Sequence, residues 1–331
     1  MALCAGRSGL AAGRDGAFPD GSTSQDMPAA FDIKEYEPME RKEPGLFLRP
    51  AEKTAAAQLK HADGLRQQGN LKKAARQYDA LVHVWHNSPE AATAQMALAR
   101  LTVDLKKYRK AFDEYQYLLD NFSGAYAYEA ILDKQLQLAN LLRTMKYGRF
   151  LFLPGVTDPE RALPLFERII RNAPNWDRAP DAKLQMAQIF EVQEDYDKAV
   201  EAYEALVSRY AGNALVPEAV YSAAECLYKL AKKSDRDEAP QRRALSAYAK
   251  FIRDYPADAH RATAEARVVE LKAALGQMLM DRALYYDQIT KNTVAAVIAY
   301  QDYLRAFPAS ARSDEVRARI ATLQKQKEAK P

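Results

Sequence analysis

The chain has 331 residues, of which 48% are hydrophobic and 28% are charged, and its formal net charge is +4. This composition is typical of a soluble globular protein, and so small a positive charge argues against a dedicated nucleic-acid-binding protein. Only 13 residues are glycine, and six of them fall within residues 1–53. The scarcity of glycine beyond that point argues against phosphate-binding loops, dinucleotide-binding folds and β-barrels, and it favours an all-α fold.

Residues 1–53 have the composition of a flexible leader. They are rich in Gly, Ala, Ser, Asp and Pro and have no helical periodicity. Because low hydrophobicity cannot offset the entropy of ordering, we expect most of this segment to be mobile. The part from Ile33 to Leu48 contains some apolar side chains, and we expect it to lie in extended form against the first helices. The residues after Met1 lack the apolar stretch of a signal peptide as written.

A pattern of small, aromatic and apolar residues repeats from Thr54 onward. An alanine is followed by an aromatic residue four positions later and by an apolar residue three positions after that. These spacings place all three side chains on one face of a helix, where the alanine allows a neighbouring helix to approach closely. The six copies are Ala74-Tyr78-Leu81, Ala111-Tyr115-Leu118, Ala162-Phe166-Ile169, Ala199-Tyr203-Leu206, Ala244-Tyr248-Phe251 and Ala296-Tyr300-Tyr303.

The pattern predicts pairs of antiparallel helices, A and B, with the marker alanine in helix B. Three copies have a second alanine twelve residues upstream, at Ala62, Ala99 and Ala187, where helix A is expected. The B-helix positions match the tetratricopeptide repeat, although the tryptophan and Leu-Gly of its first helix are missing. We therefore predict an all-α, tetratricopeptide-like, right-handed superhelical solenoid of about six helix pairs over residues 54–331.

Three stretches depart from the regular repeat. A helix expected over about 128–146 is followed by the apolar run 150–153, before the next helix begins near Asp158. Residues 232–241 are predicted to form a charged loop. Between about Asp258 and Ile289 the chain is too long for one repeat helix, which suggests an additional helix over 262–275 running into the last A helix.

Two groups of residues are candidates for binding a protein partner. Phe150 and Phe152 belong to an apolar loop between repeats, and an exposed apolar loop would mark a contact site. The alternative is that this loop folds back over the third repeat. Tyr126, Tyr128 and Tyr221 are expected on or beside A helices, where amphipathic rings suit contact with a peptide.

The sequence provides no convincing site for a metal or a cofactor. His83 and His86 are three residues apart on a predicted helix, but no third ligand is placed near them in sequence. The acidic residues within 235–238 lack the glycine and closing glutamate of a calcium loop. Cys4 and Cys226 fall in unlike segments, so neither a disulfide nor a zinc site is expected.

No catalytic motif emerges either, and we expect a protein that is not an enzyme. There is no Ser/His/Asp set, no Cys/His pair and no phosphate-binding loop. The basic pairs at 106–107 and 232–233 are most simply interpreted as solvated helix faces. No apolar run approaches the ~20 residues of a membrane-spanning helix.

The C-terminal part of the chain, over about residues 240–325, resembles the BamD family. These proteins are the tetratricopeptide lipoprotein subunits of the bacterial outer-membrane β-barrel assembly machine. The order and spacing of several short runs carry the resemblance, while the rest of the chain matches only as tetratricopeptide repeats. The runs are Arg243–Pro256, Arg267–Lys272, Ala283–Tyr286, Val294–Val297 and Tyr303–Pro308.

The resemblance implies a scaffold on the periplasmic side of the outer membrane. Its partners would be the barrel-forming subunit of the machine or unfolded outer-membrane protein segments, and it would meet the membrane only through a lipid anchor. The sequence departs from the family in two ways: it has six repeats where five are usual, and Leu3 precedes Cys4 where a lipidation motif has a small residue. The alternatives are a general tetratricopeptide adaptor of another envelope or cytoplasmic complex, and a regulatory domain that associates with an enzyme.

Overall fold

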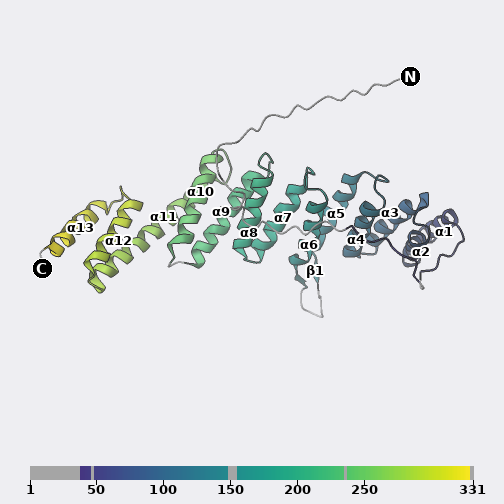
Figure 1. Cartoon of the computed structure of the whole chain (residues 1–331), viewed down its shortest axis with the longest axis horizontal. Coiled ribbons are helices and arrows are strands. Elements are labelled where there is room, and N and C mark those ends of the chain that lie inside the picture. The colour runs from purple at the N-terminus through teal and green to yellow at the C-terminus, as the bar shows by residue number, and fades with distance from the viewer. Residues whose placement is uncertain (1–37, 46–47, 148–154, 235–236, 329–331) are drawn as a thin grey trace, which may run out of the picture. The chain divides into compact units, whose positions relative to one another are not determined.

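The structure, a computed structural model, describes residues 38–45, 48–147, 155–234 and 237–328, which all belong to one compact unit, Ile33–Pro331. Thirteen α-helices lie in the described residues (Figure 1). They are α1 (Ala55–Gln67), α2 (Leu71–Val84), α3 (Pro89–Asp104), α4 (Tyr108–Asn121), α5 (Tyr128–Thr144), α6 (Leu163–Asn172), α7 (Ala179–Val192), α8 (Tyr196–Arg209), α9 (Val216–Lys233), α10 (Glu238–Asp254), α11 (Arg261–Leu284), α12 (Thr293–Ala306) and α13 (Ser313–Glu328).

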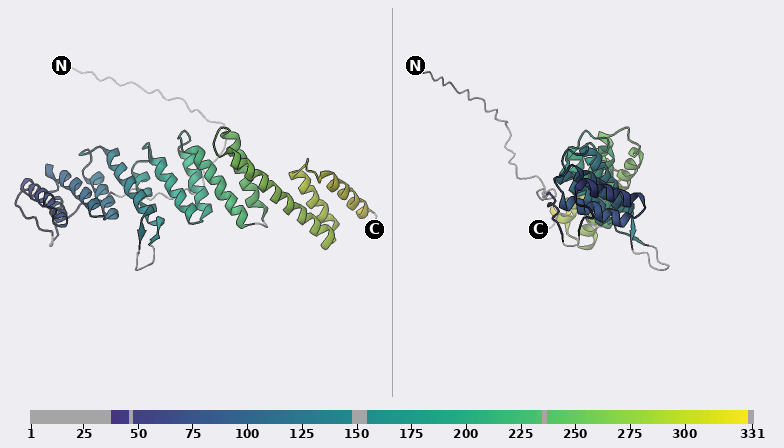
Figure 2. Two further views of the ribbon diagram at one scale, coloured as in Figure 1. Left: turned by 180° about the vertical axis from the view of Figure 1, so that it is seen from behind. Right: turned by 90° about the vertical axis from the view of Figure 1, so that its right-hand side faces the viewer.

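The predicted solenoid of six helix pairs is confirmed. Each helix packs against the next in chain order from α1 to α13, and Figure 2 shows this succession from the opposite side. Odd-numbered helices up to α11 are the A helices, and each is followed by its B helix. All six marker alanines are fully buried, as are the upstream alanines Ala62, Ala99 and Ala187. The last helix, α13, packs against α12 after the sixth pair.

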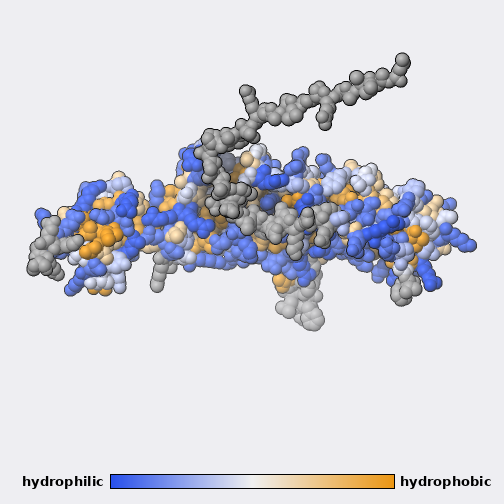
Figure 3. All heavy atoms as spheres, viewed as in Figure 1, coloured by the Kyte–Doolittle hydropathy of each residue, from blue (hydrophilic) through white to orange (hydrophobic). Residues whose placement is uncertain are grey.

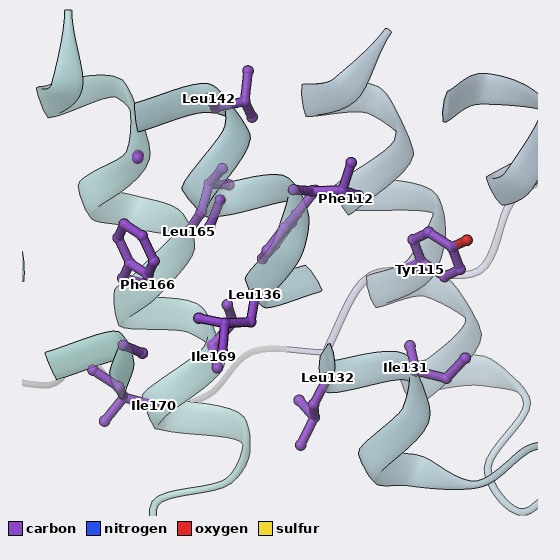
Figure 4. Packing of buried hydrophobic residues seen from close by; sticks show 14 of the residues in the cluster. Phe112, Tyr115, Ile131, Leu132, Leu136, Leu142, Leu165, Phe166, Ile169 and Ile170 are labelled. Carbon is purple, nitrogen blue, oxygen red and sulfur yellow. The ribbon is translucent and has the colours of Figure 1, made fainter. Parts of the chain in front are cut away.

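The hydrophobic core forms where the marker residues of one helix meet the next. Figure 4 shows α4 of the second repeat beside α5 and α6 of the third, with their side chains pointing toward one another. Phe112 and Phe166 are completely buried there. Burial of each large side chain contributes roughly 2 kcal/mol through the hydrophobic effect.

Four of the marker tyrosines place a buried hydroxyl against a carboxylate of their own A helix or the π-helix that follows it. A buried phenol needs such a partner, because an unpaired polar group in the core is costly. The carboxylates had no signal of their own in the sequence pattern. The hydroxyl of Tyr78 donates to Asp63 (2.6 Å), that of Tyr203 to Glu191 (2.9 Å), that of Tyr248 to Glu225 (2.6 Å) and that of Tyr300 to Asp287 (3.0 Å).

In four of the six repeats, the turn between helix A and helix B contains a residue with a left-handed backbone five positions before the marker alanine. In repeat one this residue is Gly69, with φ of +77°. The equivalent residues are Lys106 (+58°), Glu194 (+60°) and Lys291 (+51°). A left-handed conformation costs a non-glycine residue about 1–2 kcal/mol. These turns are therefore strained wherever the chain does not use glycine.

We expect the substitution Lys291→Gly to raise the free energy of unfolding by about 0.5–1 kcal/mol. Glycine removes the energetic cost of the left-handed backbone in the folded chain. Part of this stabilisation is lost again, because glycine makes the unfolded chain more flexible. Denaturant unfolding followed by circular dichroism measures the change. The control is Lys272→Gly in the exposed interior of α11, which is expected to destabilise by about 1 kcal/mol. A loss of stability in both variants would contradict the prediction.

The additional helix expected over 262–275 is wrong as a separate element. The structure has one continuous helix, α11, of 24 residues, which is followed by a π-helix at Tyr285–Ile289. Buried residues continue at helical spacing through Leu271, Leu275 and Leu279, so nothing ends the helix at 275.

The predicted charged loop at 232–241 is shorter than expected. Helix α9 runs to Lys233 and α10 begins at Glu238, so Lys232, Lys233 and Glu238 lie on helices. Gln241 is buried, and its amide donates to the carbonyl of Ala231 at 3.0 Å. Charged residues at the ends of long helices resemble a loop in sequence because both are solvated.

Two short strands precede and follow the apolar run 150–153 of the third repeat. Strands β1 (Lys146–Tyr147) and β2 (Val156–Thr157) pair antiparallel, with Lys146 opposite Thr157. A 3₁₀-helix, Pro159–Ala162, then leads into α6. Phe150 and Phe152, the candidate partner contacts, lie outside the described residues.

Candidate protein-binding surfaces

Polar side chains are buried between the helices of the first two repeats at the same repeat positions. Gln58 in α1 donates to the side chain of Gln77 in α2 at 2.7 Å. Thirty-seven residues further on, Gln95 in α3 donates to the carboxylate of Glu114 in α4 at 2.8 Å. Both donor glutamines are completely buried. The two repeats therefore place polar acceptors at equivalent positions where helix A meets helix B.

The chain segment before α1 lies along these acceptors. We call residues 38–45 and 48–52 the N-terminal strap. The backbone amide of Met39 donates to Asp120 at 2.9 Å, and that of Lys42 donates to the Tyr117 hydroxyl at 3.0 Å. Further along, the amide of Ala51 donates to Gln77 at 3.1 Å and that of Glu52 to Gln58 at 3.0 Å. The expectation that part of the leader lies against the first helices is confirmed for the described residues.

Lys42 anchors the strap in an acidic notch formed by Asp79, Gln95, Glu114 and Tyr117, which we call the lysine notch. Its Nζ lies 2.6 Å from Glu114 Oε2, 3.1 Å from Asp79 Oδ1 and 3.3 Å from Gln95 Oε1. It also lies 4.7 Å from the centre of the Tyr117 ring.

The lysine notch is largely closed to solvent. The side chain of Lys42 is 18% exposed and that of Glu114 is 6% exposed. Burial opposes the charged form of Lys42, yet the carboxylates of Glu114 and Asp79 outweigh it and raise the pKa of the lysine. The ammonium group is therefore held charged by its partners, and each carboxylate depends on it in return.

The sequence-predicted tyrosines fall into two separate surroundings. Tyr126 and Tyr128 line a shallow depression beside Phe122 at the start of α5, and the Tyr128 hydroxyl donates to the carbonyl of Asn172 at 3.0 Å. Tyr221 lies on α9, where its hydroxyl donates to Glu225 at 3.0 Å. Burial and the nearby Glu225 raise the pKa of Tyr221 to about 12. The structure thus brings the first two tyrosines together but gives Tyr221 different neighbours.

The two histidines weighed as metal ligands make local contacts. The Nδ1 atom of His83 lies 2.7 Å from the carbonyl oxygen of Asp79, within hydrogen-bonding distance. The ring of His86 stacks on Phe122 with 4.8 Å between ring centres. In the described part of the chain, no group of three or more His, Cys, Asp or Glu residues has the arrangement of a metal site.

Large apolar side chains are exposed on the last repeat. Tyr285 (52% exposed) and Ile289 (70%) lie on the π-helix, and Val294 (51%) and Ile298 (54%) lie one turn apart on α12. In the view of Figure 3, hydrophobic atoms gather over the C-terminal helices. Exposed apolar side chains of this size are typical of protein-binding surfaces.

The π-helix that carries two of these residues is hydrogen-bonded to side chains of α12 and α13. Asp287 accepts two hydrogen bonds from the guanidinium of Arg319, both at 2.7 Å, and one from Tyr300. The Arg319 guanidinium holds the pKa of Asp287 below its ordinary value. Among the described residues no helix combines the length and apolar character needed to cross a bilayer.

These features define a tetratricopeptide-repeat protein, and residues 59–126 match a model of that repeat. A second family model, of the outer membrane lipoproteins known as YfiO, matches residues 156–329, which is more than half of the chain. The chain therefore belongs to the outer membrane lipoprotein family YfiO. This match begins well before residue 240, where the resemblance seen in the sequence starts.

Two curated relatives are similar to this chain in sequence, and both are BamD proteins. The chain is 30% identical over 136 residues to the outer membrane protein assembly factor BamD of Neisseria gonorrhoeae, which covers 38% of this chain and 51% of the relative. The same values hold for BamD of Neisseria meningitidis. The chain spans about half the length of the curated relatives it matches.

Solved structures similar to this chain are repeat proteins of low sequence identity. The C-terminal part of a TPR repeat-containing protein from Cytophaga hutchinsonii is 16% identical, with a TM-score of 0.34, over 80% of this chain and 88% of the other. YrrB, described as a TPR protein with an unusual peptide-binding site, is 19% identical, with a TM-score of 0.31, over 64% of this chain and 92% of the other.

Proposed function

We propose that this chain is a scaffold or adaptor of the outer-membrane protein assembly machinery, acts on the periplasmic side of the outer membrane, and binds protein partners through its repeats. The observation that carries the proposal is the family match over residues 156–329. It includes the π-helix and α12, which leave Ile289 and Ile298 exposed. Tetratricopeptide repeats bind proteins or peptides on such surfaces.

The partners that fit this role are the barrel-forming subunit of the machine and unfolded segments of outer-membrane proteins. Both present apolar surface or extended chain that the exposed side chains of the last repeat can cover. We expect a non-catalytic role, no nucleic-acid partner, and contact with the membrane through a lipid anchor. Tyr126, Tyr128 and Tyr221 remain proposed contacts, as do Phe150 and Phe152.

Capture assays with the purified barrel-forming subunit test this function. The double variant Ile289→Ser/Ile298→Ser is expected to weaken capture at least about 10-fold, because two exposed apolar anchors are lost. The melting temperature should barely move, because both side chains are already exposed. A second double variant, Phe150→Ser/Phe152→Ser, is expected to abolish capture in the same way if the apolar loop binds the partner. The control is Val192→Ser on α7, whose side chain is 71% exposed outside the last repeat.

Three outcomes would contradict the proposal or its assigned contacts. Failure of the unaltered chain to capture the barrel-forming subunit, with recovery of another complex instead, would favour a general tetratricopeptide adaptor. Loss of melting temperature in the Ile289/Ile298 variant would mean that these side chains stabilise the fold rather than bind a partner. Specific recovery of an enzyme would favour a regulatory domain.

A further inference from the structure

The turn between α3 and α4 carries a cluster of positive charge that the fold arranges around a cavity. Lys106, Lys107, Arg109 and Lys110 lie at this turn, and Arg161 faces them from the 3₁₀-helix before α6. Together with apolar residues they line a cavity of about 510 Å³, which we call the basic pocket. Its lining within the described residues contains no Asp or Glu.

Carboxylates near the basic pocket neutralise it only in part. Arg161 is paired with Asp158 at 2.7 Å, and Arg109 lies 4.0 Å from Asp113. Lys110 lies 3.6 Å from Glu114, but that carboxylate is bonded more closely, at 2.6 Å, to Lys42 of the strap. Both lysines of the turn, 106 and 107, are exposed to solvent. The surroundings of the pocket therefore keep an excess of positive charge.

The backbone adds to this charge at the same place. Helix α4 begins at Tyr108, has no acidic residue in its first turn, and receives no hydrogen bond from the side chain at its N-cap, Lys107. Free amides and the helix dipole at such an end attract anions. In the corresponding turn of repeat four, Asp195 caps the amide of Lys198 instead. The turn of repeat two therefore differs from that of repeat four both in its charge and in its capping.

The walls of the basic pocket are apolar. Leu142 and Met145 come from the end of α5, Pro164 from the start of α6, and the ring of Tyr108 from α4. A small inorganic ion would leave these walls uncovered. An anion attached to an apolar body would satisfy the cations at the rim and cover the walls as well.

We propose that the basic pocket binds a phosphate-bearing amphiphile, and specifically the headgroup of an anionic phospholipid at a membrane surface. The phosphate contacts the lysines of the turn and the amides at the start of α4, and the glycerol and first methylenes lie against Leu142 and Met145. This gives the solenoid its own contact with a membrane, independent of any lipid anchor and of the partner-binding residues on the last repeat.

Vesicle co-sedimentation of the full chain tests the proposal. We expect the chain to bind vesicles that contain phosphatidylglycerol and to leave vesicles of phosphatidylcholine alone in solution. The variant Lys106→Gln/Lys107→Gln is expected to bind about 30-fold more weakly, because each lysine near an anionic surface contributes about fivefold. The control, Lys72→Gln/Lys73→Gln, makes the same change at two exposed lysines at the start of α2 and should bind normally.

Three results would overturn the proposal. The first is equal binding to the two kinds of vesicle. The second is an equal loss of binding in the control variant and the test variant, which would indicate nonspecific attraction. Calorimetry with inorganic phosphate or an acidic peptide covers the remaining case: binding of either that depends on Lys106 and Lys107, without vesicle binding, would assign the pocket to a soluble ligand. None of these measurements involves the assembly machinery, so the proposed function can fail separately.

Discussion

The substitution Lys42→Met is expected to lower the free energy of unfolding by about 3 kcal/mol. Methionine keeps the length of the side chain but removes the charge that Glu114 and Asp79 share. Removing one partner of a buried ion pair leaves the other charge desolvated, and such changes cost about 3–5 kcal/mol. We take the lower end because Lys42 is 18% exposed. Urea unfolding followed by circular dichroism measures the loss.

The control for this prediction is Lys110→Met, which removes the second cation near Glu114 from an exposed position. We expect it to cost no more than about 1 kcal/mol, since surface ion pairs contribute little. Equal losses of unfolding free energy in the two variants would mean that burial adds nothing to the contribution of the Lys42 ion pairs. A loss below about 1 kcal/mol for Lys42→Met would show that the strap is held by its backbone hydrogen bonds alone.

Because of the same ion pairs, the difference in unfolding free energy between the unaltered chain and Lys42→Met depends on pH. Because the pKa of Lys42 is raised in the folded chain, its contribution is fully present below the ordinary lysine pKa of 10.5. It is lost as the pH rises through the folded-state value. The gap in stability between the unaltered chain and Lys42→Met should therefore stay constant through neutral pH and narrow in strong alkali.

The second large effect is expected from Phe166→Ala in the third repeat, which should lower the free energy of unfolding by about 4 kcal/mol. Phe166 on α6 is completely buried in the core cluster whose side chains are shown in Figure 4. Truncation loses the transfer energy of the ring and leaves a cavity. Denaturant unfolding measures the total, and the control Val192→Ala, at an exposed position, should change it by less than about 0.5 kcal/mol.

Hydrogen exchange can show where this loss is felt. In repeat proteins each repeat contacts only its neighbours, so destabilisation spreads over a short distance. Amides of α5 to α7 should exchange faster in Phe166→Ala, while those of α11 and α12 should keep their protection. A uniform acceleration along all described helices would instead indicate one cooperative unit.

The helices could be predicted from the sequence because their information is local. An alanine, an aromatic residue and an apolar residue at spacings of four and three define one helix face, and the six copies located six B helices. The errors at 232–241 and 262–275 arose where charged or solvent-facing residues on a helix looked like an interruption. In these places the length of the helix depends on packing against neighbouring helices, as at Leu271 and Leu275. A short sequence pattern carries no information about such packing.

The candidate sites were harder to predict because their parts are distant in sequence. Lys42 and Glu114 are separated by 72 residues, and nothing near either one identifies the other. Lys106 and Lys107 suggested a solvated face, because the apolar walls of their pocket come from Leu142 and Met145, at the end of α5. The sequence did contain a signal for the notch. The pair Gln58 and Gln77 of the first repeat is matched by Gln95 and Glu114 of the second, each 37 positions later.

The strap also sets an order of events during synthesis of the chain. Its residues leave the ribosome before any helix, but their partners extend to Asp120 and Asn121 at the end of α4. The strap can therefore dock only after the first two helix pairs have been made and folded. Until then Glu114 lacks the contact with Lys42, so the first four helices receive this ion pair from residues that were synthesised before them.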